Sequence, residues 1–187
     1  GTRQGCPLSP FLFLLAMEPL AASIRQSPLL TGIAIPGGES RAYLYADDIL
    51  LTLTDLTRSL PALMRTIDNF AVISGYSINW DKSEALPLSH ATTRGTIHGY
   101  PFRWVTSRLK YLGVLINRGL DRIVTDNLEP IIDRMKLDFE KWSHLNLSMW
   151  GKVQAVRMVT LPRFTYVLGM LPLIVPQKIL RSIDLRV

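Results

Sequence analysis

Two adjacent acidic residues interrupt an apolar stretch, and this feature constrains the fold of the chain more than any other. Residues 41–53 read Arg-Ala-Tyr-Leu-Tyr-Ala-Asp-Asp-Ile-Leu-Leu-Thr-Leu. Asp47 and Asp48 tolerate the positive φ that a two-residue hairpin turn requires. The segment therefore predicts two short antiparallel strands, with Asp47 at the tip of the hairpin that joins them.

The backbone of such a turn holds two carboxylates close together. They repel each other unless a cation lies between them, and oxygen ligands suit Mg²⁺ or Mn²⁺. Two such ions about 3.5–4 Å apart would hold the attacking and leaving oxygens of a phosphoryl transfer. The alternative is that the dipeptide only makes a turn, which is its usual role when it stands alone.

A glycine-containing segment at the start of the sequence supplies context. Residues 1–10 read Gly-Thr-Arg-Gln-Gly-Cys-Pro-Leu-Ser-Pro and lead into an apolar helical pattern, with Ser9 expected as the N-cap and Pro10 at the first helical position. Glycines allow close backbone approach, and a helix N-terminus suits phosphate or base-pair contact. Arg3 could add charge, and Gln4 a paired donor and acceptor. The alternative is a polar lead-in to a capped helix.

A lysine occupies a turn in the segment Asn-Trp-Asp-Lys-Ser, residues 79–83. Near a metal-bound triphosphate, Lys82 could act as general acid for the leaving pyrophosphate. The alternative is a solvated turn lysine.

Helical and extended patterns alternate along the chain. Helices are expected over residues 59–75, from a cap at Ser59 to a stop at Gly75, over 128–142, from Ser148 to Pro162, and after Pro176. Short extended pieces are expected over residues 77–80, 84–88, 102–106 and 109–116, with a loop over 89–99. The fold class is therefore α+β: an antiparallel sheet with helices on one face over residues 1–118, followed by an all-helical lobe over 119–187.

Composition narrows the class of partner. The 21 Lys and Arg outnumber the 15 Asp and Glu, and the net charge of +6 favours a polyanion such as nucleic acid. A single cysteine, Cys6, excludes a disulfide framework, and the spacing of the three histidines does not suit zinc. The apolar stretch 11–22 is too short to span a bilayer. Because the chain begins at Gly1, we expect it to be a piece of a longer polypeptide.

Four motifs occur in order: Arg-Gln-Gly-Cys-Pro-Leu-Ser-Pro at 3–10, Tyr-Ala-Asp-Asp at 45–48, Gly-Tyr-Ser-Ile-Asn-Trp-Asp-Lys-Ser at 75–83, and Tyr-Leu-Gly-Val at 111–114. Together they resemble the later palm motifs of reverse transcriptases, and more narrowly those of non-LTR, LINE-type retrotransposons. Residues 142–166 are similar to the thumb of those elements. The resemblance implies the C-terminal part of a palm and a helical thumb, from an RNA-directed DNA polymerase that joins dNTPs to the 3′ end of a DNA primer on an RNA template.

The resemblance also implies roles for single residues. Asp47 would be a direct ligand of the metal pair and Asp48 a secondary one, while Lys82 matches the proposed general acid. The residues that match the motif lying against the nascent base pair and the incoming nucleotide are Gln4, Gly5, Pro7 and Ser9, with Arg3 near the site. Those that match the hairpin gripping the primer end are Tyr111, Leu112 and Gly113. Tyr45 would lie near the site or serve strand packing.

One departure from the family is expected to matter. The family's first catalytic aspartate lies on a strand before the Arg-Gln-Gly motif, together with the aromatic residue that excludes the ribose 2′-hydroxyl, and no aspartate precedes Asp47 here. We therefore expect the metal site to be completed from outside this sequence and the isolated chain to be inactive. One alternative is an RNA-dependent RNA polymerase, which also has a carboxylate hairpin but commonly carries glycine where Tyr45-Ala46 stands. Another is a degenerate or domesticated fragment that at most binds nucleic acid.

Overall fold

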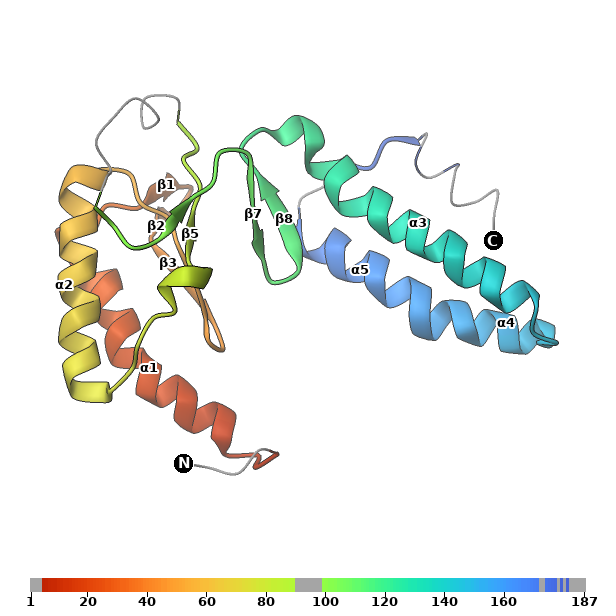
Figure 1. Cartoon of the computed structure of the whole chain (residues 1–187), viewed down its shortest axis with the longest axis horizontal. Coiled ribbons are helices and arrows are strands. Elements are labelled where there is room, and N and C mark those ends of the chain that lie inside the picture. Colours follow the sequence, from red (N-terminus) through yellow and green to blue (C-terminus); the bar gives the residue numbers. More distant parts are fainter. Residues whose placement is uncertain (1–4, 90–98, 172–173, 178, 180, 182–187) are drawn as a thin grey trace. The chain divides into compact units, whose positions relative to one another are not determined.

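The computed structural model describes residues 5–89, 99–171, 174–177, 179 and 181. The chain forms two compact units, an N-terminal unit of Gly1–Asn79 and a C-terminal unit of Trp80–Val187 (Figure 1). Both units mix helices with short strands, so the predicted α+β class is confirmed.

Two helices and two hairpins make up the N-terminal unit. Its elements are α1 (Ser9–Gln26), β1 (Ile33–Ile35), β2 (Gly38–Ser40), β3 (Ala42–Tyr45), β4 (Asp48–Leu51) and α2 (Leu56–Ser74). β1 pairs antiparallel with β2, and β3 with β4. The two helices pack together, and α1 also lies against β3 (Figure 1).

Helix α1 begins differently from the prediction. Leu8 is its N-cap, and Ser9 is its first residue rather than its cap. The reason is a tight turn before the helix, in which the Ser9 N–H donates to the Cys6 carbonyl at 3.1 Å, so the backbone is already turning at residue 9. Only the second half of α1 is deeply buried, through Met17, Leu20, Ala21 and Ile24.

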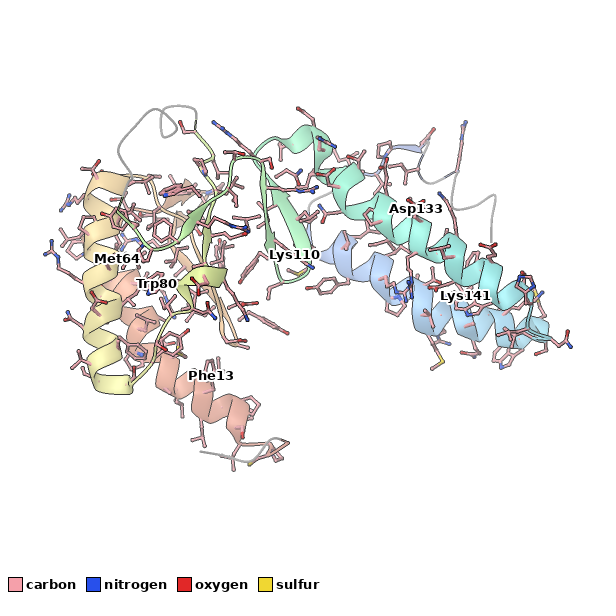
Figure 2. The ribbon with its side chains drawn as sticks, viewed as in Figure 1. Phe13, Met64, Trp80, Lys110, Asp133 and Lys141 are labelled. Carbon is pink, nitrogen blue, oxygen red and sulfur yellow. The ribbon has the colours of Figure 1, made fainter. Side chains whose placement is uncertain are left out.

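Helix α2 begins earlier than the predicted cap at Ser59. Asp55 is the N-cap, and its carboxylate accepts from the Arg58 N–H at 3.3 Å. Ser59 lies inside the helix and is fully buried, where its hydroxyl donates to the Leu29 carbonyl and accepts from the Thr31 N–H. The predicted stop is confirmed, because Gly75 ends the helix at a φ of 68°. Phe13 of α1 and Met64 of α2 are half-buried (Figure 2).

The C-terminal unit carries short strands followed by helices. Its elements are η1 (Trp80–Lys82), β5 (Glu84–Ala85), β6 (Arg103–Trp104), β7 (Arg108–Tyr111), β8 (Val114–Asn117), η3 (Leu120–Arg122), α3 (Ile123–Ser143), α4 (Met149–Ala155), η4 (Val156–Thr160) and α5 (Leu161–Met170). β5 and β6 pair in parallel, and β7 pairs antiparallel with β8.

Three expectations for the strands change. The extended piece expected over 109–116 is a hairpin of two strands, because Leu112 and Gly113 form a turn in its middle. The piece expected over 77–80 is not a strand, since Trp80 begins a 3₁₀ turn. Within the described residues, the strands form four two-stranded sheets rather than one continuous sheet. Most of the loop expected over 89–99 lies outside the described residues.

The helix predicted from Ser148 to Pro162 begins where the sequence predicts but does not end there. Ser148 caps α4 and accepts from the Gly151 N–H at 3.1 Å. The helix does not end at Pro162, because the π turn η4 leads directly into α5. Pro162 is the second residue of α5, directly after the π turn.

The β7–β8 hairpin packs on the helices that follow it. The Asn127 side chain bonds both the N–H and the C=O of Leu115 in β8, at 2.7 and 2.9 Å. Val114 of the hairpin is buried in one core with Leu128 of α3, Val167 of α5 and Leu171, the C-cap of α5. The hairpin therefore belongs with the helices in the C-terminal unit, which begins at Trp80. The palm and thumb boundary at 118/119 stays a prediction.

The outer face of α3 is polar. Asp133 pairs with Lys136 at 2.6 Å, and Lys141 is exposed further along the helix (Figure 2). Among the described residues, none of the helices is both long enough and apolar enough to cross a membrane.

Candidate active site

The β3–β4 hairpin places Asp47 at its tip, as the sequence predicts. Tyr45 pairs with Asp48, so the two turn residues are Ala46 and Asp47. Ala46, not an aspartate, has the positive φ, at 49°. The turn therefore lies one residue earlier than the sequence suggested, and Asp48 is the first residue of β4.

The two carboxylates are exposed and act on a tyrosine of the same unit. Asp47 and Asp48 both face solvent. Burial raises the pKa of the Tyr76 hydroxyl, and the negative charges of Asp47 and Asp48 raise it further. Tyr76 therefore lies within electrostatic reach of the hairpin tip, where the two negative charges disfavour its ionised form.

Tyr76 is a site residue that sequence reasoning missed. It follows the Gly75 cap, and its ring lies 5.9 Å from that of Phe70, centroid to centroid. Its place in the motif at 75–83 was the available signal. The sequence did not predict that the chain after α2 returns toward the β3–β4 hairpin.

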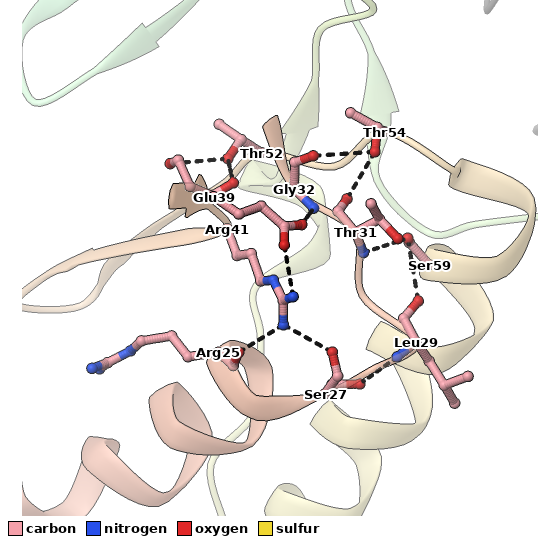
Figure 3. A network of polar contacts seen from close by, with 11 residues as sticks. Arg25, Ser27, Leu29, Thr31, Gly32, Glu39, Arg41, Thr52, Thr54 and Ser59 are labelled. Carbon is pink, nitrogen blue, oxygen red and sulfur yellow. Dashed lines mark hydrogen bonds and ion pairs between the residues drawn. The ribbon is translucent and has the colours of Figure 1, made fainter. Parts of the chain in front are cut away.

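A polar network holds the base of the hairpin (Figure 3). The Arg41 guanidinium donates to the carbonyls of Arg25 and Ser27 at 2.7 and 2.9 Å, and to the Glu39 carboxylate at 2.7 Å. Thr52, just after β4, donates its N–H to the Arg41 carbonyl at 2.9 Å. The residue that precedes β3 is thus tied to the end of α1 and to the end of β4.

Glu39 completes this network. It accepts hydrogen bonds from Arg41 and from the Gly32 N–H (Figure 3). The Arg41 hydrogen bond, with a smaller effect of the Gly32 N–H, lowers the pKa of the Glu39 carboxyl. Because Arg41 is fully engaged in these contacts, we interpret it as a structural residue rather than a ligand for phosphate.

The segment before α1 is described only from Gly5 onward. Gly5 has a φ of 86°, which favours glycine, and no atom lies within 4 Å of the position that a Cβ would occupy, so the predicted close backbone approach to a ligand stays a prediction. Pro7 is exposed, and Ser9 is half-buried in the first turn of α1. Arg3 and Gln4 lie outside the described residues.

Lys82 is exposed at the end of η1, in the C-terminal unit. Asp47 lies in the N-terminal unit. A general acid must reach the leaving group, so this role requires Lys82 to lie on the same side of the sheet as Asp47. That placement, and with it the role of Lys82 as general acid, stays a prediction.

A second hairpin of similar construction carries the residues expected to grip the primer. Tyr111 pairs with Val114, and the turn consists of Leu112 at a φ of 46° and Gly113 at 81°. Positive φ at both turn residues is the pattern of a type I′ turn. The Tyr166 hydroxyl of α5 donates a hydrogen bond to the Leu112 carbonyl. Tyr166 is the second residue that sequence reasoning missed, although it lies in the stretch that resembles a thumb.

Whether the β3–β4 hairpin can bind a divalent metal ion depends on the ligand atoms that it offers. Asp47 and Asp48 offer exposed carboxylate oxygens, which are the ligands that Mg²⁺ and Mn²⁺ prefer. Within the part of the chain that the structure describes, no group of three or more His, Cys, Asp or Glu residues could hold a metal ion. The hairpin thus offers oxygen ligands of the kind that a divalent ion binds, but not a complete ligand set.

Comparison with known proteins identifies the family. Residues 1–116 match the family described as reverse transcriptase (RNA-dependent DNA polymerase). The chain belongs to this family. The prediction of a polymerase segment is therefore confirmed, and members of the family generally use divalent metal ions.

Two relatives narrow the assignment. The chain is 30% identical over 173 residues to the transposon TX1 uncharacterized 149 kDa protein of Xenopus laevis, covering 89% of this chain and 13% of that protein. It is 37% identical over 139 residues to the retrovirus-related Pol polyprotein from type-1 retrotransposable element R2 of Popillia japonica, covering 73% of this chain and 16% of the polyprotein. The reverse transcriptase segment is thus of the non-LTR, LINE type. It spans only 13% to 16% of the length of these relatives.

Proposed function

We propose that this chain is the part of an RNA-directed DNA polymerase that supplies metal-binding carboxylates and a hairpin for the primer end. The observation that carries the proposal is Asp47 at the exposed tip of a hairpin, inside a segment that matches the reverse transcriptase family. The reaction joins dNTPs to the 3′ end of a DNA primer on an RNA template. The net charge of +6 suits such partners.

Asp47 and Asp48 are the residues of this chain that would hold metal. Asp47 is the direct ligand and Asp48 the secondary one, with Mg²⁺ or Mn²⁺ as the ion. When bound, a pair of divalent ions activates the attacking 3′-hydroxyl and neutralises charge on the leaving pyrophosphate. A further carboxylate, outside this sequence, completes the ligand set in this proposal. Tyr76 belongs to the surroundings of these carboxylates, because their negative charges raise the pKa of its hydroxyl.

Other residues position the substrates in this proposal. The segment around Gly5, Pro7 and Ser9, with Arg3 and Gln4 before it, lies against the nascent base pair and the incoming nucleotide. The turn formed by residues 111–113 meets the primer end. Lys82 gives a proton to the leaving pyrophosphate through its ammonium group. Residues 1–118 form the palm portion and residues 119–187 the thumb portion.

Primer extension by the polymerase that contains this chain tests the proposal. We expect dNTP incorporation on an oligo-primed RNA template in Mg²⁺ or Mn²⁺, loss of incorporation on chelation with EDTA, and recovery when the ion is returned. Preferential incorporation of rNTPs would instead identify an RNA-dependent RNA polymerase. Nucleic-acid binding without any incorporation would identify an inactive or domesticated fragment.

A further inference from the structure

We propose that Tyr166 is a positioning residue for the primer end, because its hydroxyl holds the turn of the β7–β8 hairpin in a single conformation. This inference rests on the proposed role of residues 111–113 in gripping the primer. It adds a residue of helix α5, far along the sequence, to the structure that presents the turn.

The turn needs support from outside the hairpin. Leu112 has a φ of 46°, in the left-handed region that a side chain bearing a Cβ rarely adopts. Such a conformation persists where the surrounding structure holds it in place. Gly113 at 81° adopts the region freely, so the strain of the turn is concentrated at Leu112.

Tyr166 contacts both residues of the turn. Its hydroxyl donates to the Leu112 carbonyl. Its ring carbon Cε1 lies 3.8 Å from the position that a Cβ on Gly113 would occupy, so the ring covers the glycine. In a trans peptide the C=O and the following N–H point in opposite directions. By holding the Leu112 carbonyl, Tyr166 therefore also fixes the direction of the Gly113 N–H.

The position of Tyr166 is set by its neighbour. Val167 is buried in the same core as Val114 of β8, so the helix and the hairpin are packed against each other next to the hydrogen bond. Tyr166 itself is 47% exposed. Removing its hydroxyl should therefore leave the core intact, and a phenylalanine should keep the packing on Gly113 while losing only the hydrogen bond.

A direct test compares Tyr166→Phe with Tyr100→Phe. Tyr100 is a matched control because it lies in the same unit and stacks on Phe102, at 5.8 Å between ring centroids, a contact that phenylalanine keeps. Hydrogen exchange of the 187-residue chain reports the turn itself. We expect faster exchange over residues 110–115 in Tyr166→Phe alone. Unchanged exchange there would overturn the inference.

The functional readout is equilibrium binding by the polymerase that contains this chain, measured by fluorescence anisotropy. The probes are an RNA template with a recessed DNA primer and the same RNA without a primer. We expect Tyr166→Phe to weaken binding of the primed template about two- to tenfold, as for the loss of one hydrogen bond, and to leave the unprimed RNA unchanged. Tyr100→Phe should change neither affinity.

Each remaining outcome points to one failure. If Tyr166→Phe weakens binding of both probes equally, or of neither, the Tyr166 contact is only structural. The proposed primer-gripping role of residues 111–113 would still stand if the unsubstituted polymerase binds the primed template more tightly than the unprimed RNA. A parent protein that does not distinguish the two probes would contradict the primer-gripping role itself, and the positioning role of Tyr166 with it.

Discussion

Gly32 occupies a position that leaves no room for a side chain. A Cβ at this residue would overlap the carbonyl oxygen of Ser40 and lie 2.7 Å from its carbonyl carbon. Both are backbone atoms, which cannot rotate away. The Gly32 N–H also donates to Glu39, the partner of Arg41 at the base of the β3–β4 hairpin (Figure 3). The network below the candidate site thus depends on this glycine.

Gly32→Ala should destabilise the chain by roughly 1–3 kcal/mol, as overpacking does in a filled interior. The matched control is Gly169→Ala in α5, where no atom lies within 4 Å of the added Cβ and alanine favours the helix by roughly 0.5–1 kcal/mol. Urea unfolding followed by circular dichroism gives both midpoints. A midpoint for Gly32→Ala at or above that of Gly169→Ala would contradict the steric argument.

At the scale of the elements, the sequence predicted the boundaries that depend on neighbouring residues but not those that depend on tertiary contacts. The hairpin at 41–53, the helix start at Ser148 and the stop at Gly75 depend on neighbouring residues, and the sequence predicted them. Ser59 looked like a cap, but it is a buried hydroxyl that serves a loop about 30 residues earlier in the chain. The predicted helix end at Pro162 is wrong because the π-helical backbone of η4 leads directly into α5.

The residues of the candidate site also fall into those that local sequence signals predicted and those that depend on tertiary contacts. The apolar runs on both sides of the acidic pair predicted Asp47 at the tip of a hairpin. Tyr76 and Tyr166 lie in stretches that resemble family motifs, but those motifs did not single them out. Their importance comes from what lies near them in space, namely the charge of Asp47 and the Leu112 carbonyl. A single sequence contains no record of those contacts.

An ion pair joins the two long helices of the C-terminal unit and makes their packing sensitive to pH. Asp138 of α3 accepts from Arg163 of α5 at 2.6 Å, and Arg134 lies 3.5 Å from it. The Arg163 hydrogen bond is the largest cause that lowers the pKa of the Asp138 carboxyl, and the charges of Arg163, Arg134 and Lys141 lower it further. A lowered pKa in the folded state means that the ionised form stabilises the fold.

Asp138→Asn should therefore remove a pH-dependent part of the stability. The stabilisation is present above the unfolded pKa of about 3.9 and is lost as the pH falls through the lower folded pKa. In urea unfolding, the difference between the natural chain and the variant should be largest near neutral pH and should shrink below about pH 4. A difference that stays constant down to the acid limit would show that the ion pair contributes nothing.

At the scale of the whole molecule, the N-terminal unit carries the β3–β4 hairpin and the C-terminal unit carries the β7–β8 hairpin. Two carboxylates from one hairpin cannot hold a pair of ions in register for in-line attack without another ligand. We therefore expect the isolated 187-residue chain to incorporate no radiolabelled nucleotide on an oligo-primed RNA template, in Mg²⁺ or in Mn²⁺. Its basic excess should still support weak binding of nucleic acid that decreases with salt.

Incorporation by the isolated chain that disappears in Asp47→Asn would show that these residues suffice for catalysis. It would also show that the missing ligand lies within this sequence. The incorporation assay and the nucleic-acid binding assay use the same purified preparations. Retained binding therefore shows that a preparation without incorporation still contains folded protein.

The central claim, that Asp47 is a metal-binding carboxylate of a reverse transcriptase, is tested most directly by single-turnover dNTP addition in the polymerase that contains this chain. The comparison is between Asp47→Asn and Asp68→Asn, because Asp68 is an exposed aspartate on α2 and loses the same charge. We expect Asp47→Asn to slow addition by roughly a hundred- to ten-thousandfold at an unchanged unfolding midpoint, since several kcal/mol of transition-state stabilisation are lost. Asp68→Asn should extend the primer at the natural rate, and a near-natural rate for Asp47→Asn would contradict the account.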